Sequence, residues 1–333
     1  MGSKVPLKIL GLVALALASL LVSLHSGPVP LTWHQIFSYF THSPMAKEDF
    51  FLVGAIRLPR TIAAFLVGAS LGVSGLVLQT LLKNPLAEPY TLGLSGGGSL
   101  GAIVALYLGL EPGVFWVPAL STLGCIGAAG LVLSLGLRRM ALESRSLILF
   151  GVMVSLFFGA LVVTGLSILS PVQLQAALFW LLGQFGTSRD LWIYHLASPL
   201  FLAILIISFR ASALDGLSLG DARAFSLGFS PVRERVVLVL LCTFLTALAV
   251  SVSGLVGFIG LVSPHLTRRI LKTARHRFLI IGSALVGSAL LTLADSFARF
   301  IGGSEIPAGS IAALGGAPLL LFLLMERDHA SIE

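Results

Sequence analysis

The strongest constraint on the fold of this chain is a series of apolar runs of similar length. A helix needs about 20 mostly apolar residues to cross a hydrocarbon core of about 30 Å. With 56% hydrophobic and only 11% charged residues, the chain also lacks the polar residues that cover a soluble domain. We therefore expect an all-α membrane protein, which excludes a cytosolic enzyme, a secreted disulfide scaffold and a disordered tail. Eight simple runs lie near residues 6–24, 61–82, 91–110, 114–137, 146–169, 191–209, 278–298 and 306–325.

A ninth run, Val236–Leu271, is too long for one crossing of the membrane. Its 36 residues would measure about 54 Å as one helix. Gly254, Gly257, Gly260 and Pro264 interrupt it. We predict two passes here, the second a short one, and therefore ten membrane-spanning helices in one domain that covers the whole chain, residues 1–333. An even number of spans places both termini on the same side of the membrane.

The distribution of positive charge predicts the orientation, because Lys and Arg accumulate in cytoplasmic loops. With a cytoplasmic N-terminus, 16 of the 21 Lys and Arg residues fall inside and 5 outside. We expect both termini in the cytoplasm, and the net charge of +7 then needs no nucleic-acid partner. A cleaved signal peptide at residues 1–24 is the alternative, but it would leave nine spans and a poorer balance. The inside set is Lys4, Lys8, Lys83, Arg138, Arg139, Arg145, Arg210, Arg223, Arg233, Arg235, Arg268, Arg269, Lys272, Arg275, Arg277 and Arg327; Lys47, Arg57, Arg60, Arg189 and Arg299 lie outside.

A short sequence occurs twice. Val73–Val77 is repeated letter for letter as Val252–Val256, and a proline follows each copy by eight residues, as Pro85 and Pro264. Five predicted spans separate the copies, so the second would have the opposite orientation in the membrane. Inverted repeats with interrupted helices are typical of transporters. Chance recurrence in so apolar a composition is the alternative.

The predicted spans offer little for catalysis. Asp295 and Arg299 are four residues apart, the spacing of a pair on one helix face, so we expect Asp295 to orient that arginine. The two cysteines, Cys125 and Cys242, lie in separate apolar runs and indicate neither a disulfide nor a zinc site. No nucleophile–base arrangement and no metal cluster emerges. None of the five lysines follows a glycine, so the chain has no P-loop. We expect no catalytic residue, no metal site and no cofactor in this chain.

Two blocks of sequence resemble the permeases of ABC importers for ferric siderophores, haem and cobalamin, the FecCD type. The first block contains Arg57–Arg60, Asn84–Pro89 and Leu92-Gly93, and is most like that of cobalamin permeases. The second contains Gly257–His265 and Leu293–Asp295, followed by Arg299. Together they extend over nearly the whole chain. Differences at Pro89-Tyr90-Thr91 and at Ser95–Gly98 leave the cargo open between the three kinds of chelate.

The resemblance implies a type II importer permease in the plasma (inner) membrane of a bacterium or archaeon. Its expected partners are a second copy of the chain, two cytoplasmic ATPase subunits that bind ATP and Mg, an extracytoplasmic substrate-binding protein and membrane lipid. An ion-coupled secondary transporter is the alternative; the repeat favours it and the scarcity of buried charge opposes it. An intramembrane enzyme is opposed by the lack of a catalytic constellation.

The family's binding-protein docking arginines correspond to Arg57, Arg60 and Arg299. Charge pairs of this kind control docking register and association rate more than affinity. The alternative is that these side chains only hold helix ends at the lipid headgroups.

The predicted cytoplasmic segment 210–235 resembles the family's ATPase-coupling helices. Leu219, Ala222, Phe225 and Ser226 fall on one side of a short helix that Gly228 and Pro231 would end. Exposed apolar side chains in a loop favour a partner over a solvated turn. The expected coupling residues are Gly220, Asp221, Ala222, Arg223, Ala224, Phe225, Ser226, Leu227 and Gly228.

The inner gate of the family lies at the cytoplasmic ends of spans. The corresponding residues here include the Asn84-Pro85 turn, which is also a good turn sequence in its own right, and the turn at Glu143-Ser144. His265 fits a hydrogen-bonded packing role as well as a role in the path. The candidate gate and path residues are Gln79, Asn84, Pro85, Leu86, Glu143, Ser144, Pro264 and His265.

Overall fold

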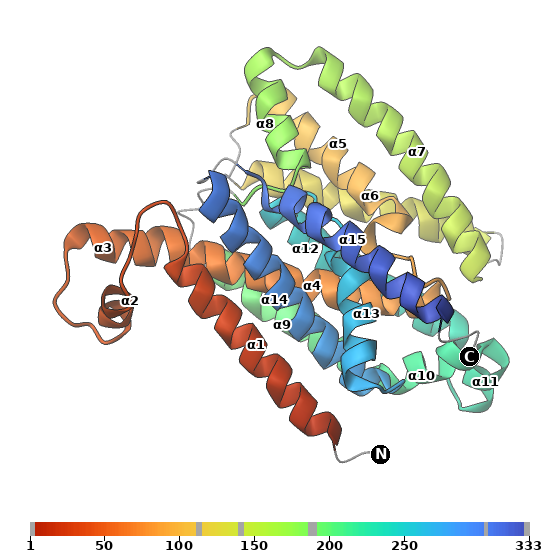
Figure 1. The fold of residues 1–333 in the computed structure, drawn as a ribbon. Coiled ribbons are helices and arrows are strands. Elements are labelled where there is room, and N and C mark those ends of the chain that lie inside the picture. Colours follow the sequence, from red (N-terminus) through yellow and green to blue (C-terminus); the bar gives the residue numbers. More distant parts are fainter. Residues whose placement is uncertain (1–3, 111–114, 139–142, 186–191, 303–305, 330–333) are drawn as a thin grey trace.

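The computed structural model describes residues 4–110, 115–138, 143–185, 192–302 and 306–329, and within these ranges it contains helices and no strand (Figure 1). The helices form one bundle. The elements are α1 (Val5–His25), α2 (Trp33–Phe40), α3 (Lys47–Phe51), the π-helical turn η2 (Leu52–Arg57), α4 (Leu58–Leu81), the 3-10 turn η3 (Pro89–Leu92), α5 (Leu94–Tyr107), α6 (Trp116–Arg138), α7 (Ser144–Ile168), α8 (Pro171–Leu181), α9 (Trp192–Phe209), α10 (Ala211–Leu219), α11 (Asp221–Ser226), α12 (Pro231–Ser253), α13 (Ile259–Leu271), α14 (His276–Gly302) and α15 (Ala308–His329).

Within the described residues, six helices are long and apolar enough to cross a membrane: α1, the continuous helix Lys47–Leu81, α6, α7, α12 and α14. A seventh results if α9 and α10, which meet at a bend of 52°, count as one span. The apolar helices α5 and α15 fall short of the same length, and α13 has 13 residues. Every predicted apolar run lies on a helix, and the expected break of the ninth run separates α12 from α13. The all-helical membrane fold is confirmed, and the count of ten spans stays a prediction.

Helix α4 lies at the centre of the bundle and packs against α12, α13 and α14 (Figure 1). Glycines allow this close approach. A Cβ atom built on Gly75 would lie 1.9 Å from the carbonyl oxygen of Gly260, and one on Gly68 would lie 2.3 Å from that of Gly287. Both contacts are with backbone, which cannot rotate away as a side chain can. The glycines of α4 therefore permit helix packing that alanine would prevent.

The break between α12 and α13 is stabilised by a side chain from another part of the chain. Backbone groups outside a helix need partners at membrane depth, because lipid supplies none. The hydroxyl of Tyr90 accepts a hydrogen bond from the backbone N–H of Val256 at 3.0 Å and donates to its carbonyl at 3.1 Å. Gly254, with φ +65°, starts the break. Tyr90 therefore supplies the partner that the interrupted helix has lost.

The two copies of the repeated sequence adopt different local structures. Val73–Val77 lies inside α4, whereas Val252–Val256 begins at the end of α12 and continues into the break. Pro85 lies in the turn after α4, and Pro264 lies inside α13. Identical letters therefore do not produce identical backbones here, and the inverted repeat stays a prediction.

Candidate functional site

The candidate residues gather at two opposite ends of the bundle. The arginine end, where α1 and α14 finish and α4 begins, contains Arg57, Arg60 and Arg299. The coupling end, where α4 finishes, α14 begins and α10 and α11 lie, contains the predicted coupling and gate residues (Figure 1). The 24 residues of α4 connect the two ends over about 36 Å.

At the arginine end, one buried carboxylate pairs with two arginines. Arg60 Nη2 lies 2.7 Å from Asp295 Oδ1, and Arg299 Nε lies 3.1 Å from Asp295 Oδ2. The second pair confirms the expectation that Asp295 orients Arg299. The first joins residues 235 positions apart and was not predicted. Asp295 therefore ties the start of α4 to the end of α14.

The third arginine of this end binds backbone carbonyls. Arg57 donates to the carbonyl oxygens of Leu24 and His25, both at 2.8 Å, and to that of Val29. Arg299 donates in addition to the carbonyl of Ser26 at 2.8 Å. These bonds fasten the end of α1 to the bundle.

The three arginines are buried, with exposed fractions of 3% for Arg57, 8% for Arg60 and 5% for Arg299. Among the residues that the structure describes, their partners include one carboxylate, that of Asp295, together with the backbone carbonyls of Leu24 and Ser26. The sequence placed Arg299 correctly near the end of α14, whereas Arg57 and Arg60 lie inside the continuous helix Lys47–Leu81. It did not show the burial of the three side chains.

The coupling end presents an apolar surface. Phe225 is 75% exposed, Leu219 61% and Leu227 60%, whereas Ala224 is buried and faces Gly216 of α10. Ala222 and Ser226 are exposed as well. A short helix that ends at Ser226, before Gly228 and Pro231, is confirmed. The prediction that Leu219 belongs to the same helix was wrong, because Gly220, with φ +114°, separates α11 from α10, which ends at Leu219.

Ion pairs hold this surface on α12. Arg235 donates to both carboxylate oxygens of Asp221, at 2.7 and 2.6 Å, and Arg210 donates to both oxygens of Glu234, at 2.7 and 2.8 Å. The hydrogen bonds from Arg235 lower the pKa of Asp221 below its ordinary value. The two pairs fix α11 and the start of α10 against the first turn of α12.

Four of the predicted gate residues line one cavity of about 610 Å³ between the end of α4, α13 and α15. These are Gln79, Asn84, Pro85 and His265. Arg268 lines it too, and its Nη1 donates to Gln79 Oε1 at 2.7 Å. Arg268 was not selected from the sequence, although it stands three residues after His265 and so shares its helix face. Of the other four candidates, Pro264 is buried inside α13 and Leu86 is half exposed, while Glu143 and Ser144 line another cavity.

Glu143 and Ser144 lie in a different place from the rest of the predicted gate. They line a separate cavity of about 400 Å³ together with Asp221 and Arg235 of the coupling segment. The hydroxyl of Ser144 donates to the carbonyl of Leu81 at 2.8 Å. Lys83 lines both this cavity and that of the gate. This turn therefore lies between the end of α4 and α11.

A polar link that the sequence did not reveal joins α10 to α4. Asp215 Oδ1, on α10, accepts a hydrogen bond from the backbone N–H of His276 at 3.0 Å and lies 2.6 Å from its Nδ1. His276 Nε2 lies 2.9 Å from Thr80 Oγ1 in the last turn of α4. We call these three residues the Asp215–His276–Thr80 link. No local spacing signals it, because its members come from three separate helices.

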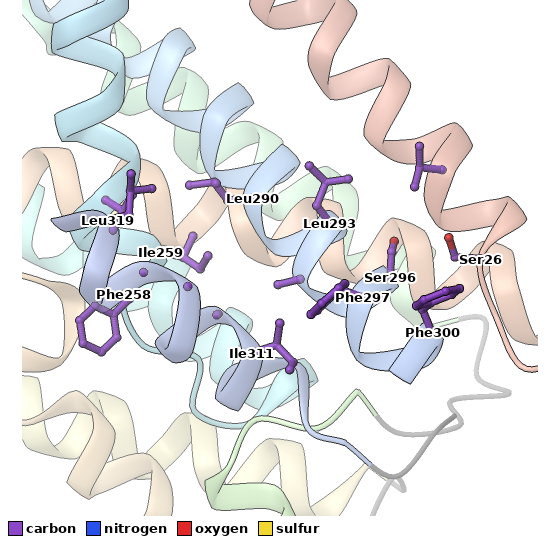
Figure 2. A pocket seen from close by; sticks show the side chains of 16 residues that line it. Ser26, Phe258, Ile259, Leu290, Leu293, Ser296, Phe297, Phe300, Ile311 and Leu319 are labelled. Carbon is purple, nitrogen blue, oxygen red and sulfur yellow. The ribbon is translucent and has the colours of Figure 1, made fainter. Parts of the chain in front are cut away.

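An apolar cavity of about 530 Å³ lies nearer the arginine end, between α1, α13, α14 and α15 (Figure 2). Phe258, Phe297 and Phe300 contribute to its wall, and no titratable side chain is among the described residues that line it. Its described wall is therefore mainly apolar, and the hydroxyls of Ser26 and Ser296 are its polar side-chain groups. Across the described residues, no group of three or more His, Cys, Asp or Glu could hold a metal ion.

Comparisons with known proteins agree with this architecture. The model of the FecCD transport family matches residues 15–326. The chain is 38% identical to an uncharacterized ABC transporter permease, YvrB of Bacillus subtilis, over 92% of this chain and 88% of that protein. It is 36% identical to the vitamin B12 import system permease BtuC of Shigella flexneri, over 96% and 95% of the two chains.

Two solved structures are similar in fold. A metal-chelate type ABC transporter in an inward-facing conformation superposes with a TM-score of 0.82 at 30% identity, over 96% of this chain and 99% of that one. PsaBC of Streptococcus pneumoniae, in complex with a Fab, has a TM-score of 0.59 at 18% identity, over 86% and 95% of the two chains. The second likeness concerns the fold alone.

Proposed function

The chain belongs to the FecCD transport family, and on this premise we propose that it is the membrane-spanning permease subunit of an ATP-binding-cassette importer for a metal chelate. The observation that carries the proposal is the identity of 36% to a vitamin B12 import permease over 96% of this chain. The cargo is a cobalamin, a ferric siderophore or haem. The chain performs no covalent chemistry, and ATP and Mg bind to partner subunits.

The subunit crosses the membrane ten times in one domain, by α1, α4, α5, α6, α7, α9, α12, α13, α14 and α15, as two inverted groups of five. The agreement of each predicted apolar run with one of these helices supports this topology. The start of α1 and the end of α15 both lie at the coupling end, since Lys8 donates to Ile270 and Leu323 lines the gate cavity. Both termini are therefore cytoplasmic, in the inner membrane of a bacterium or archaeon.

Two copies of the chain assemble with two ATPase subunits. The exposed side chains of Phe225, Leu219 and Leu227 enter a cleft of each ATPase, because apolar side chains this exposed are stabilised by a partner. The ion pairs of Asp221 and Glu234 make the surface rigid enough to transmit a displacement. Binding of ATP brings the two coupling segments together and moves the permease subunits relative to each other.

The substrate-binding protein docks at the arginine end. Among the described residues, the partners of Arg57, Arg60 and Arg299 include the single carboxylate of Asp295, and this supports a binding protein that presents acidic side chains, because a field of one sign attracts and orients the opposite charge. Because the three arginine side chains are buried, the binding protein can contact directly only the few exposed atoms at the edge of this cluster. The same arginines hold α1, α4 and α14 together, so docking and helix packing share these residues.

The gate at the coupling end consists of Gln79, Asn84, Pro85 and His265, with Leu86 and Pro264 beside them. Their common cavity supports this assignment. Glu143 and Ser144 lie between the gate and the coupling segment, where a movement of α11 reaches them first.

The test is ATP-driven uptake by the complete system. The chain, its ATPase and its binding protein are reconstituted in liposomes with radiolabelled cyanocobalamin, ferrichrome or haemin, whichever the binding protein retains. We expect uptake that requires ATP and all three proteins. Uptake by the chain alone under an ion gradient would instead establish a secondary transporter.

A further inference from the structure

The Asp215–His276–Thr80 link begins with one carboxylate oxygen that makes two contacts. Asp215 Oδ1 accepts from the backbone N–H of His276 at 3.0 Å and lies 2.6 Å from the Nδ1 of the same residue. His276 is the first residue of α14, and a carboxylate there also interacts favourably with the positive end of the helix dipole. The oxygen therefore attaches α10 to both the backbone and the side chain at the start of α14.

The other end of the imidazole has an equally specific partner. A carboxylate only accepts, so the neutral imidazole donates from Nδ1 to Asp215 and is an acceptor at Nε2. The hydroxyl of Thr80 lies 2.9 Å from His276 Nε2 and 2.9 Å from the carbonyl of Leu76, and its hydrogen is the one that can be donated to the ring. His276 and Thr80 are 4% and 8% exposed. With both ring nitrogens engaged, the imidazole cannot rotate without loss of two buried hydrogen bonds.

The link continues into the gate. Gln79 is the residue before Thr80 in α4. Its Oε1 accepts a hydrogen bond from Arg268 of α13, and its side chain lines the cavity that contains the predicted gate residues. A second cavity of about 610 Å³ is lined by Ser218 of α10, Thr80, His276 and Arg268. Four helices thus surround one hollow region, and the link lies in its wall. The space leaves room for α10 to shift relative to α4 and α13.

We propose that His276 is a positioning residue that transmits the displacement of the coupling segment to the gate end of α4. The proposal rests on the proposed function and adds the route by which α11 and α10 act on Gln79. When the ATPase moves α11 and α10, Asp215 of α10 displaces the start of α14. Through the imidazole of His276, the same movement displaces the last turn of α4. Without the link, α10 still packs against the core through apolar side chains such as Ala211, Leu214 and Leu217. Apolar packing has no fixed direction, so the gate follows incompletely.

The test compares Thr80→Val, which removes the hydroxyl at nearly constant volume, with Thr80→Ser, which keeps it. The readout is the number of cargo molecules transported per ATP hydrolysed by the complete importer in liposomes. This ratio does not depend on the folded fraction, because transport and hydrolysis both scale with it. We expect Thr80→Val to lower the ratio about five-fold or more, with hydrolysis within about two-fold of wild type, and Thr80→Ser to restore it.

Ser288→Ala is the matched control, because Ser288 joins the same two helices near their middle by donating to the carbonyl of Phe65 at 2.8 Å. It should keep the wild-type ratio. His276→Ala should lower the ratio as Thr80→Val does, and the double variant should be no worse than either, since both remove one link. Unchanged coupling in Thr80→Val, equal loss in Thr80→Ser or Ser288→Ala, or additive losses in the double variant would overturn the proposal.

The failure of this inference is distinguishable from that of the proposed function. If the wild-type system takes up no cargo with ATP, the proposed function is wrong. If it does so and Thr80→Val transports as much cargo per ATP, only the role of the link is wrong.

Discussion

The two ends of the bundle differ in where their charged and apolar side chains lie, buried or exposed. At the arginine end, Arg57, Arg60 and Arg299 are buried and bind Asp295 or backbone carbonyls. At the coupling end, Asp221 pairs with Arg235 while its side chain stays 45% exposed, and Phe225 projects from the surface. Charge at the first end stabilises the packing of helices. Charge at the second end supports an exposed apolar surface.

The largest expected effect is that of Asp295→Asn at the arginine end. This change leaves Arg60 and Arg299 buried without a carboxylate, and the loss of one partner of a buried ion pair costs about 3–5 kcal/mol of stability. Unfolding of the detergent-solubilised protein measures it. Asp221→Asn, the matched change at the coupling end, should cost about 1 kcal/mol or less because the carboxylate is 45% exposed and solvent screens it, although Arg235 is buried. Equal losses at the two ends would contradict the comparison.

The next effect is functional and belongs to the coupling end. Phe225→Asp should reduce ATP-driven uptake about ten-fold or more, as expected for an aromatic residue at the centre of an interface, while stability stays unchanged because the ring is 75% exposed. Uptake and ATP hydrolysis are measured on the same liposomes. Phe40→Asp, at an exposed phenylalanine of α2, is the control and should transport normally. Normal coupled uptake by Phe225→Asp would exclude α11 from the ATPase interface.

A smaller effect concerns docking at the arginine end. Arg57→Gln should weaken association with the binding protein about two- to five-fold at low salt and less at high salt. Arg57 is buried, so it attracts acidic side chains of the partner from a distance through solvent, and salt screens that attraction. Surface plasmon resonance at several ionic strengths measures it, with the unfolding temperature recorded for the same sample. Equal association of wild type and variant at low salt would leave Arg57 with the packing role alone.

The smallest effect is the pH dependence of the Asp221 pair. Arg235 lowers the pKa of Asp221, so the carboxylate stabilises the fold above its ordinary pKa of about 3.9 and this contribution is lost as the pH falls through the lowered value. The difference in unfolding free energy between wild type and Asp221→Asn should therefore be constant near neutral pH and shrink below about pH 3.9. A difference that shrinks as the pH rises would have the wrong sign.

The sequence predicted those features that depend on local composition. Apolar runs and interrupting glycines located the helices, and the break after Ser253 occurs where Gly254 was expected to cause it. The exposed face of α11 followed from helical spacing. Tyr90 could not be recognised as the partner of Val256, because 166 residues separate them and no periodicity connects the two. The division of the predicted gate residues between two cavities was equally out of reach.

By itself, the amino-acid sequence determined that this chain crosses a membrane as helices, where those helices lie, and that one short segment exposes apolar side chains. Burial of apolar area and hydrogen bonding of the backbone within each helix depend on neighbouring residues, so both can be recognised from a short stretch of sequence. Only the tertiary structure decided that Arg60 pairs with Asp295, that Asp215 reaches Thr80 through His276, and that Gln79 and His265 share one cavity. These contacts depend on how the helices pack, and packing depends on the shapes of surfaces that are distant in the chain.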